Sequence, residues 1–267
     1  MKWRPGRRRG FQLLGALVLA YFGLAYVALP ALWRHREHEP GLTSLPMLTH
    51  TSTGIPGDAL NVGLVGHQAD VLRALQAAGW FPADPVTLRS SIAIVGSVVL
   101  DRPYQDAPVS PLYYQGKREQ FAFEKPDGRS PDRRHHVRFW RVLDTGTDGR
   151  PVWLGAATYD RGVGLSRYTG QITHHIGPDI DAERDLLIHD LTSAGMLDAV
   201  FQISGVGPTL FGRNGGGDPY YTDGEIDMGS LVAGGVKRTE PPANLSLPPL
   251  IALKDQIWHG VGNAIGQ

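Results

Sequence analysis

The pattern of hydrophobic and polar positions divides the chain into three regions. Residues 11–29, FQLLGALVLAYFGLAYVAL, carry no charged side chain. Residues 34–57 mix Pro, Gly, Thr and Ser with a few charges and show no sustained hydrophobic period. From residue 58 onwards, short apolar segments alternate with turn-rich ones. This order predicts a hydrophobic helix, then a linker, then a folded domain.

The apolar run predicts a transmembrane anchor over residues 11–32. Its 19 uncharged residues rise 1.5 Å each in a helix, which nearly matches a hydrocarbon core of about 30 Å. Pro30 then marks the expected end of the helix. A cleaved signal peptide is the alternative, but its apolar region is usually only about 7–15 residues long.

Basic residues are distributed unevenly around this run. Five precede it and two follow it: Lys2, Arg4, Arg7, Arg8 and Arg9, then Arg34 and Arg36. The positive-inside rule therefore predicts that residues 1–10 form a cytoplasmic tail and that the rest of the chain is exported. In a Gram-negative cell the exported part would be periplasmic.

The exported part is predicted to contain one domain. We expect a linker over 33–57, a domain over 58–238 and a tail over 239–267 whose prolines make it a poor candidate for the core. Residues 61–66 predict a strand, and 67–80 an amphipathic helix that ends at Gly79.

The remaining elements predict an α+β domain. Residues 90–100 read as a helix or a strand, and we favour the helix. Three strands separated by turns follow at 120–125, 135–143 and 152–160, which suggests an antiparallel meander. The later elements are a strand in GQITHHI, a helix in AERDLLIHDLTSAG with Asp181 as N-cap and Gly195 as its stop, and strands in AVFQISGVG and EIDMGSLVAGG around a loop over 213–224. The expected architecture is a mostly antiparallel sheet with two or three packed helices, preceded by the transmembrane helix.

Composition narrows the possible functions. Lys and Arg number 26, as do Asp and Glu, so no overall positive field favours nucleic acid as a partner. The chain has no cysteine, which excludes disulfides, thiolate metal sites and cysteine nucleophiles. We expect no cofactor.

Two histidine doublets provide the candidate site. In HHVRFWR a strand would place His135 with Val137 and Phe139 on one face and His136, Arg138 and Trp140 on the other. The same alternation in ITHHI groups His174 with the isoleucines and separates His175. If both strands bury their apolar faces against the same helices, His136 and His175 project from the same side of the sheet.

Imidazole and guanidinium groups together suit an anionic ligand such as a phosphate ester. The candidate ligand-binding residues are His135, His136, Arg138, Arg161, His174 and His175. If catalysis occurs, the candidates are His136 and His175 as proton carriers and Asp160 as the carboxylate that orients an imidazole. The alternative for each histidine is a purely structural role, in which its ring is buried and hydrogen-bonded.

A metal site is the further alternative. His136, His175, Asp160 and Asp181 would supply its ligands, although their spacing matches no standard zinc signature. Asp218, Asp223, Glu225 and Asp227 could be considered for calcium, but they lack the spacing of the twelve-residue calcium loop.

Several segments in order resemble the LssY-like C-terminal domain family. They are GW, YQDAPVSPL, GKREQFAFEK, RRHHVRFW, WLGAATYDRGV and THHIGPDIDAERD, spread over roughly residues 58–200. The resemblance implies a bacterial, membrane-associated protein of the cell envelope. In some members the domain accompanies a lipid-phosphatase membrane domain, but this chain has a single apolar span and none of that enzyme's motifs. The family supplies no established activity and no catalytic residue to carry over.

These observations predict a single-pass anchored, exported domain with a His/Arg-lined cleft for an anionic envelope ligand. The partners would be the lipid bilayer, through residues 11–32, and a small molecule or lipid headgroup. One alternative is a non-catalytic accessory domain that docks on a membrane partner. Another is a metal-dependent hydrolase with His and carboxylate ligands.

Overall fold

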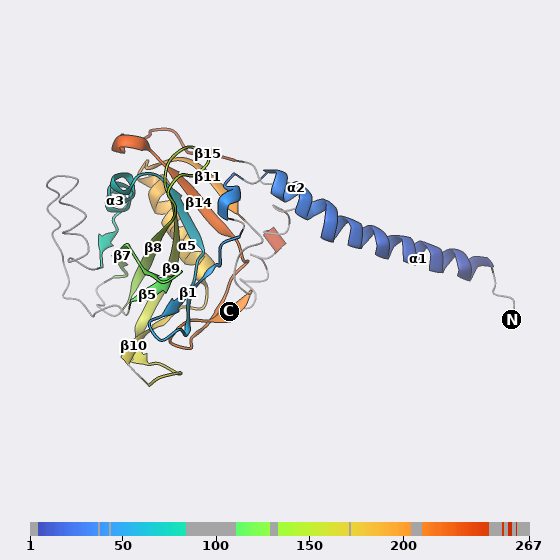
Figure 1. Ribbon diagram of the computed structural model, residues 1–267, viewed down its shortest axis with the longest axis horizontal. Coiled ribbons are helices and arrows are strands. Elements are labelled where there is room, and N and C mark those ends of the chain that lie inside the picture. The colour runs from blue at the N-terminus through green and yellow to red at the C-terminus, as the bar shows by residue number, and fades with distance from the viewer. Residues whose placement is uncertain are drawn as a thin grey trace. The chain divides into compact units, whose positions relative to one another are not determined.

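The computed structural model describes residues 5–36, 38–42, 44–83, 111–128, 133–170, 172–203 and 210–245, together with four positions between 253 and 260. It separates into two units, residues 1–40 and 41–267. The first unit is helical and the second is the α+β domain (Figure 1). The predicted elements at 90–100 lie outside the described residues.

The N-terminal unit is one continuous helix that is long and apolar enough to span a membrane. It comprises α1 (Pro5–Gly23), a π-helical turn η1 (Leu24–Ala28) and α2 (Leu29–Arg36). The apolar span is 24 residues, Arg9–Leu32. The helix does not end at Pro30 as expected. Instead, the Leu29 amide donates to the Leu24 carbonyl, and this wider turn gives the proline ring room without ending the helix.

The domain is built on a nine-stranded, mostly antiparallel sheet in the order β15-β11-β14-β3-β9-β8-β7-β4, with β10 paired to β9. The strands are β3 (Val62–Val65), β4 (Phe81–Pro82), β7 (Phe121–Pro126), β8 (Arg134–Leu143), β9 (Val152–Leu165), β10 (Ile172–Ile176), β11 (Leu197–Ile203), β14 (Ile226–Leu231) and β15 (Ala243–Asn244). The predicted meander of three strands is confirmed as β7, β8 and β9. Only β3 with β14 and β11 with β15 pair in parallel among the described strands.

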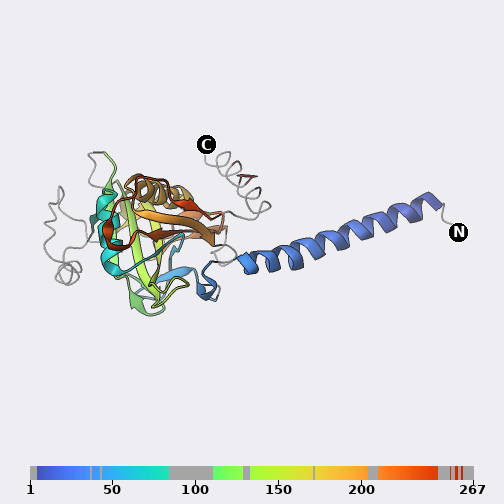
Figure 2. The same ribbon diagram turned by 90° about the horizontal axis from the view of Figure 1, so that it is seen from above.

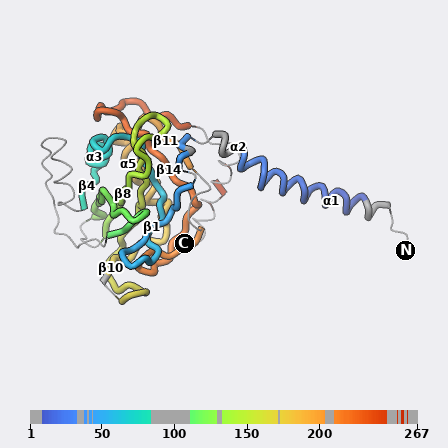
Figure 3. The backbone as a smooth tube through the Cα atoms, viewed as in Figure 1, coloured from blue at the N-terminus to red at the C-terminus, as the bar shows by residue number. Residues whose placement is uncertain are grey.

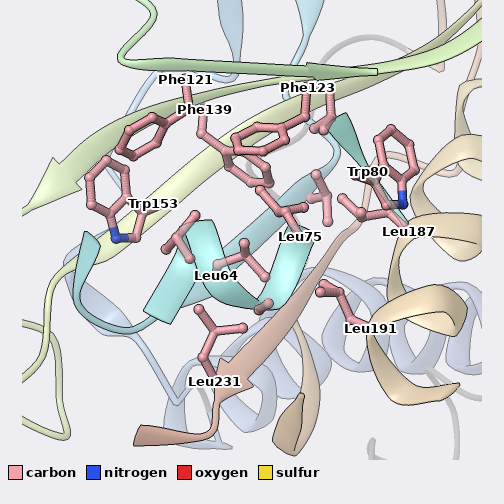
Figure 4. Packing of buried hydrophobic residues seen from close by; sticks show 14 of the residues in the cluster. Leu64, Leu75, Trp80, Phe121, Phe123, Phe139, Trp153, Leu187, Leu191 and Leu231 are labelled. Carbon is pink, nitrogen blue, oxygen red and sulfur yellow. The ribbon is translucent and has the colours of Figure 1, made fainter. Parts of the chain in front are cut away.

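Two helices cover one face of this sheet, α3 (Gln68–Ala77) and α5 (Ile180–Ser193). Figure 4 shows Leu75 of α3 near Phe123 of the sheet and Leu187 of α5 beside Trp80, while Trp153 packs next to Phe121 in another part of the same cluster. Both helices end before a glycine with positive φ, Gly79 and Gly195, as predicted. The N-cap of α5 is Asp179 and not Asp181, because the Asp179 carboxylate accepts a hydrogen bond from the Ala182 amide at 3.1 Å.

A smaller sheet covers the opposite face. It contains β2 (Pro56–Ala59), β1 (Leu48–Thr51), β5 (Leu112–Tyr114) and β6 (Lys117–Arg118), in that order. A second core cluster lies between the two sheets and includes Leu112, Trp140 and Leu154. The domain therefore has three layers, with helices, large sheet and small sheet stacked so that the large sheet is buried on both faces (Figures 1 and 2).

The small sheet includes part of the segment that we expected to be a linker. We predicted a linker over 33–57, but β1 and the start of β2 lie in that range, and Leu42 and Met47 are buried in the second cluster. A short 3-10 turn, η2 (Pro40–Leu42), precedes them. At the other end, β15 adds two residues of the predicted tail to the sheet edge, and Leu245 packs on the second cluster.

Two further elements complete the described part of the chain. The predicted loop at 213–224 contains much of a hairpin, β12 (Phe211–Arg213) and β13 (Pro219–Tyr221). A 3-10 turn, η3 (Ala233–Gly235), follows β14 and packs near α3, where the Gly234 amide donates to Asp70. The trace in Figure 3 shows β10 at one end of the domain.

Candidate functional site

Alternation along β8 places the first histidine doublet on two different faces. Val137 and Phe139 pack in the helix-side core, as predicted, and His135 lies with them. The His135 Nδ1 atom is 2.7 Å from a carboxylate oxygen of Glu183 on α5. The pairing of His135 with Glu183 thus connects the sheet to this helix.

His136 and Arg138 lie on the opposite face, beneath the small sheet. His136 is only 1% exposed and Arg138 is also buried. The next residue on this face, Trp140, packs with Leu112 and Tyr114 of β5. The face predicted to meet a cleft or solvent is therefore largely covered by the small sheet, and a cavity beside Arg138 is the part that stays uncovered.

Buried ion pairs occupy the layer between the sheets. The Arg138 Nη1 atom donates to Asp58 at 2.9 Å. Arg134 donates to Asp160 at 3.1 Å and to Glu124 at 2.8 Å. The strand register explains the contact of Arg134 with Asp160, because these two residues lie opposite each other on β8 and β9. Asp160 therefore bonds a guanidinium, whereas we expected it to orient an imidazole.

A cavity of about 280 Å³ opens beside these pairs. Its polar lining comes from the β1–β2 hairpin, from β8, from β9 and β10 with the turn between them, and from the β12–β13 turn. The polar and charged side chains that line it are Thr51, Ser52, Thr53, Asp58, Arg138, Thr158, Asp160, Ser166, Thr169, Thr173, His174 and Asn214. Ile55, Pro111, Leu112 and Ile176 form its apolar wall.

Alternation along β10 determines which histidine of the second doublet reaches the cavity. His174 and Ile176 share one face of the strand, as predicted, but this face lines the cavity and is not part of the helix-side core. The extra residue of the bulge, between Asp160 and Gly162, belongs to β9. The His174 Nε2 atom is 3.5 Å from Arg134. The shared side that we predicted for His136 and His175 is occupied by His136 and His174.

His175 is held outside the cavity by Asp218. Its Nδ1 atom is 2.9 Å from one carboxylate oxygen of Asp218, whose other oxygen accepts from the Ile176 amide at 3.2 Å. Asp218 is completely buried. Arg161 is about half exposed and approaches the same carboxylate at 3.9 Å, without lining the cavity.

Burial sets the charge state of the groups beneath the small sheet. Desolvation, followed by the charges of Arg138, Arg134 and His174, lowers the pKa of His136 well below its usual value. His136 is therefore neutral at pH 7, and its Nε2 atom has no hydrogen-bond partner among the described residues. Desolvation also raises the pKa of the Asp58 carboxyl, although Arg138 opposes the shift.

The sequence alone missed several residues of this site. Asp58 and the threonines of the β1–β2 turn fell in or beside the expected linker, and Asn214 fell in the expected loop. The three consecutive glycines after Asn214 were the available signal, because small residues allow close approach of another backbone. Gly216 accepts a hydrogen bond from the Arg167 amide at 2.8 Å.

The other metal candidates lie elsewhere. Asp181 accepts from Thr222 and from the Asp223 amide, both at 2.7 Å, near the start of α5. Asp223 and Asp227 face Arg184 on that helix. Among the described residues there is no group of three or more histidine and carboxylate side chains arranged to hold a metal ion.

The sequence profile described as LssY C-terminus matches residues 42–226, which is most of the domain and more than half of the chain. The chain belongs to the LssY C-terminus family. The matched range starts at the buried Leu42 and ends in β14, so it includes the small sheet, both histidine doublets and the hairpin that completes the cavity. Searches of the curated proteins and of the solved structures match no other protein to this chain.

Family membership and the N-terminal helix together fit a membrane-anchored LssY C-terminus domain. The helix precedes the matched range, with only a few residues between Arg36 and Leu42. The domain therefore begins almost directly after the helix.

Proposed function

We propose that this protein is a single-pass anchored, exported domain that binds a small anionic ligand of the cell envelope in the cavity beside Arg138. The single observation that carries the proposal is the composition of that cavity. A guanidinium, an imidazole and several hydroxyl groups line one cavity of about 280 Å³. A volume near the lower end for ligand pockets, roughly 300 Å³, suits a headgroup or sugar phosphate better than a polymer.

Arg138 and His174 are the proposed contacts for the anion. A guanidinium binds phosphate or carboxylate oxygens through paired, charge-assisted hydrogen bonds. The threonine hydroxyls and Asn214 would supply neutral hydrogen bonds to the same oxygens or to ligand hydroxyls. His136, buried and neutral next to this group, is the candidate proton acceptor for any reaction.

Asp58 can compensate for the negative charge of a bound anion by taking up a proton. Its carboxylate already bonds Arg138 at 2.9 Å, so an anion that approaches Arg138 also approaches a negative charge. Because burial raises the pKa of Asp58, this carboxyl can accept a proton when the anion arrives. We therefore expect ligand binding to take up a proton and to strengthen as the pH falls.

Calorimetry on the full chain in detergent tests this proposal, with glycerol phosphate and inorganic phosphate as probes. Arg138→Gln should abolish binding. Asp58→Asn should strengthen binding and remove its dependence on pH, because the competing charge is absent. His175→Gln is the matched control, since its ring bonds Asp218 outside the cavity. Equal losses in the Arg138 and His175 variants, or no binding by the wild-type protein, would reject the proposal.

An accessory docking domain is the second candidate. Its support is that two of the four doublet histidines have structural partners, His135 with Glu183 and His175 with Asp218. In this case the wild-type protein binds neither probe, and a membrane partner is recovered by crosslinking in the cell.

The proposed orientation has its own test. The chain has no cysteine, so a single cysteine in place of the exposed Val236 can be labelled selectively. In intact cells, we expect this cysteine to be labelled by a maleimide that cannot cross the cytoplasmic membrane. Protection from the reagent until the cells are lysed would place the domain in the cytoplasm.

A further inference from the structure

The ribbon of β9 and β10 projects beyond the rest of the large sheet. The pairing of β8 with β9 reaches only Asp160, and residues 161–165 of β9 pair with β10 alone among the described strands. Figures 1 and 3 show this ribbon at one end of the domain. A two-stranded ribbon is only marginally stable by itself in water. Here the Arg167 amide, which donates to the Gly216 carbonyl, ties its tip to the β12–β13 hairpin.

The two connected hairpins carry an unusual share of the exposed apolar side chains. Eight large apolar residues are exposed in the described part of the domain unit, and five of them belong to these hairpins or to the residue that precedes β12. The five are Val163, Leu165, Tyr168, Leu210 and Phe211. Leu165 is 63% exposed, and Val163 lies two residues away on the same side of its strand. Exposed apolar groups concentrated in this way indicate a contact surface.

The charges among these side chains all have one sign. Arg161 and Arg167 lie on the ribbon and Arg213 lies on β12, while residues 161–178 and 199–217 contain no Asp or Glu. The Asp218 carboxylate lies 3.9 Å from both Arg161 and Arg167, but it is completely buried, whereas the two arginine side chains are about half exposed. Apolar side chains with arginine beside them match the boundary between the acyl chains and anionic headgroups of a bilayer.

We propose that this surface, defined as Val163, Leu165, Tyr168, Leu210 and Phe211 with Arg161, Arg167 and Arg213, docks onto an anionic lipid surface. The apolar side chains enter the headgroup region and the arginines pair with lipid phosphates. The helix in the same chain holds the domain at a membrane through the short segment 37–41. This docking is independent of whether the cavity binds a ligand.

The ribbon also borders the cavity. Ser166, Thr169 and Thr173, from the ribbon and its tip, line the cavity together with Asn214 of the second hairpin. Docking would therefore bring the cavity wall to the headgroup layer. A lipid headgroup could then reach Arg138 while the acyl chains of that lipid stay in the bilayer.

The test uses the full chain reconstituted in nanodiscs at one copy per disc. A single cysteine replaces Leu165 and carries a fluorophore that is sensitive to polarity. Val236→Cys is the matched control, because Val236 is 73% exposed but follows η3, at the other end of the domain in Figure 1. The discs contain either phosphatidylcholine alone or phosphatidylcholine with phosphatidylglycerol, and a spin label is attached to a portion of the lipid.

We expect the Leu165 label to shift to shorter wavelength and to be quenched by the lipid spin label, while the Val236 label stays in water. The effect should be larger with phosphatidylglycerol. Replacing both Arg161 and Arg167 with Gln should lower the docking equilibrium constant in these discs by about fivefold per arginine. In phosphatidylcholine alone the two replacements should have little effect.

Two results would overturn the proposal. The first is identical emission and quenching for the Leu165 and Val236 labels in anionic discs. The second is shielding of Leu165 that appears only when several copies share one bilayer, because that result assigns the surface to contact between protein molecules. Neither result bears on phosphate binding measured in detergent, so the cavity proposal is tested separately.

Discussion

Arg138 and Arg184 are both buried arginines, but their surroundings differ. Arg184 on α5 donates two hydrogen bonds to Asp223, at 2.9 and 3.2 Å, and one to Asp185 at 3.0 Å. Arg138 donates to Asp58 next to a cavity whose wall also contains His174 and several hydroxyls. A guanidinium enclosed by carboxylates holds elements together, whereas one beside an open polar space has room to meet a ligand.

The pKa shifts show the same difference. Burial acts to lower the pKa of Arg184, but the charges of Asp227 and Asp223 outweigh it and hold that pKa well above its usual value. Near Arg138, burial lowers the pKa of His136 and leaves a neutral imidazole. The cluster around Arg184 has a structural role, because its carboxylates hold the guanidinium between α5 and the segment from Asp223 to Asp227. The other keeps a neutral group that can exchange protons.

The largest expected effect is the loss of stability in Arg184→Met. Removing the guanidinium leaves several carboxylates buried without their counter-charge, so we expect the free energy of unfolding to fall by about 3–5 kcal/mol. Arg141→Met is the control, because the pair of Arg141 with Asp144 is exposed and contributes less than about 1 kcal/mol. Urea denaturation of both variants measures the difference, and similar losses would remove the structural role assigned to Arg184.

Arg138→Met should cost less, about 1–3 kcal/mol. This substitution removes the counter-charge of Asp58, whereas Arg184 meets four carboxylates, those of Asp181, Asp185, Asp223 and Asp227. The same denaturation experiment applies, and a loss equal to that of the Arg184 variant would contradict the comparison.

Asp227 should make the domain more stable in mild acid. Burial raises its pKa to about 6, against about 3.9 for an unfolded Asp. The folded state therefore binds more protons between these values, and its stability falls by about 1–3 kcal/mol as the pH rises through this window. In Asp227→Asn this contribution should disappear from denaturation curves recorded between pH 4 and 7. An unchanged pH profile would show that Asp227 ionises normally.

His136 should give an effect of the opposite sign. Its folded pKa is below the unfolded value of about 6.5. Protons then bind the unfolded state first, so this residue destabilises the fold as the pH drops below 6.5. His136→Phe should change stability by less than about 1 kcal/mol at pH 7, because the lost Nε2 atom has no partner, and should reduce the loss in acid. A large loss at pH 7 would show that the imidazole has a structural role.

The sequence predicted those features that depend on local periodicity. Strand alternation correctly separated Val137 and Phe139 from Arg138 and Trp140. Hydrophobic periodicity and turn residues also predicted the two helices α3 and α5, the three-stranded meander and the two glycines that end the helices. The N-cap assignment failed by two residues, because Asp179 and Asp181 are equivalent in sequence. In the structure Asp179 accepts from the Ala182 amide, whereas Asp181 accepts from Thr222 and from the Asp223 amide.

The site could be predicted only in part, because its partners come from distant segments. Asp58 is 80 residues before Arg138, and nothing in the composition of its segment marks it as part of a second sheet. Alternation grouped His174 with Ile176 as the structure has it, but the prediction assumed that this face packs against the helices, whereas both side chains line the cavity. The histidine doublets pointed to β8 and β10, and the structure brings His174 of the second doublet, not His175, to the cavity beside Arg138.

The position of β3 has a consequence for the order in which the domain can form. This strand is made early, yet it lies between β9 and β14, and its parallel neighbour begins only at Ile226. While the ribosome is still synthesising the middle of the chain, the hydrogen-bonding edge of β3 has no native partner. Such long-range parallel pairing is slow and leaves strand edges open to aggregation. Newly made chains should therefore depend on chaperones until almost the entire polypeptide has emerged.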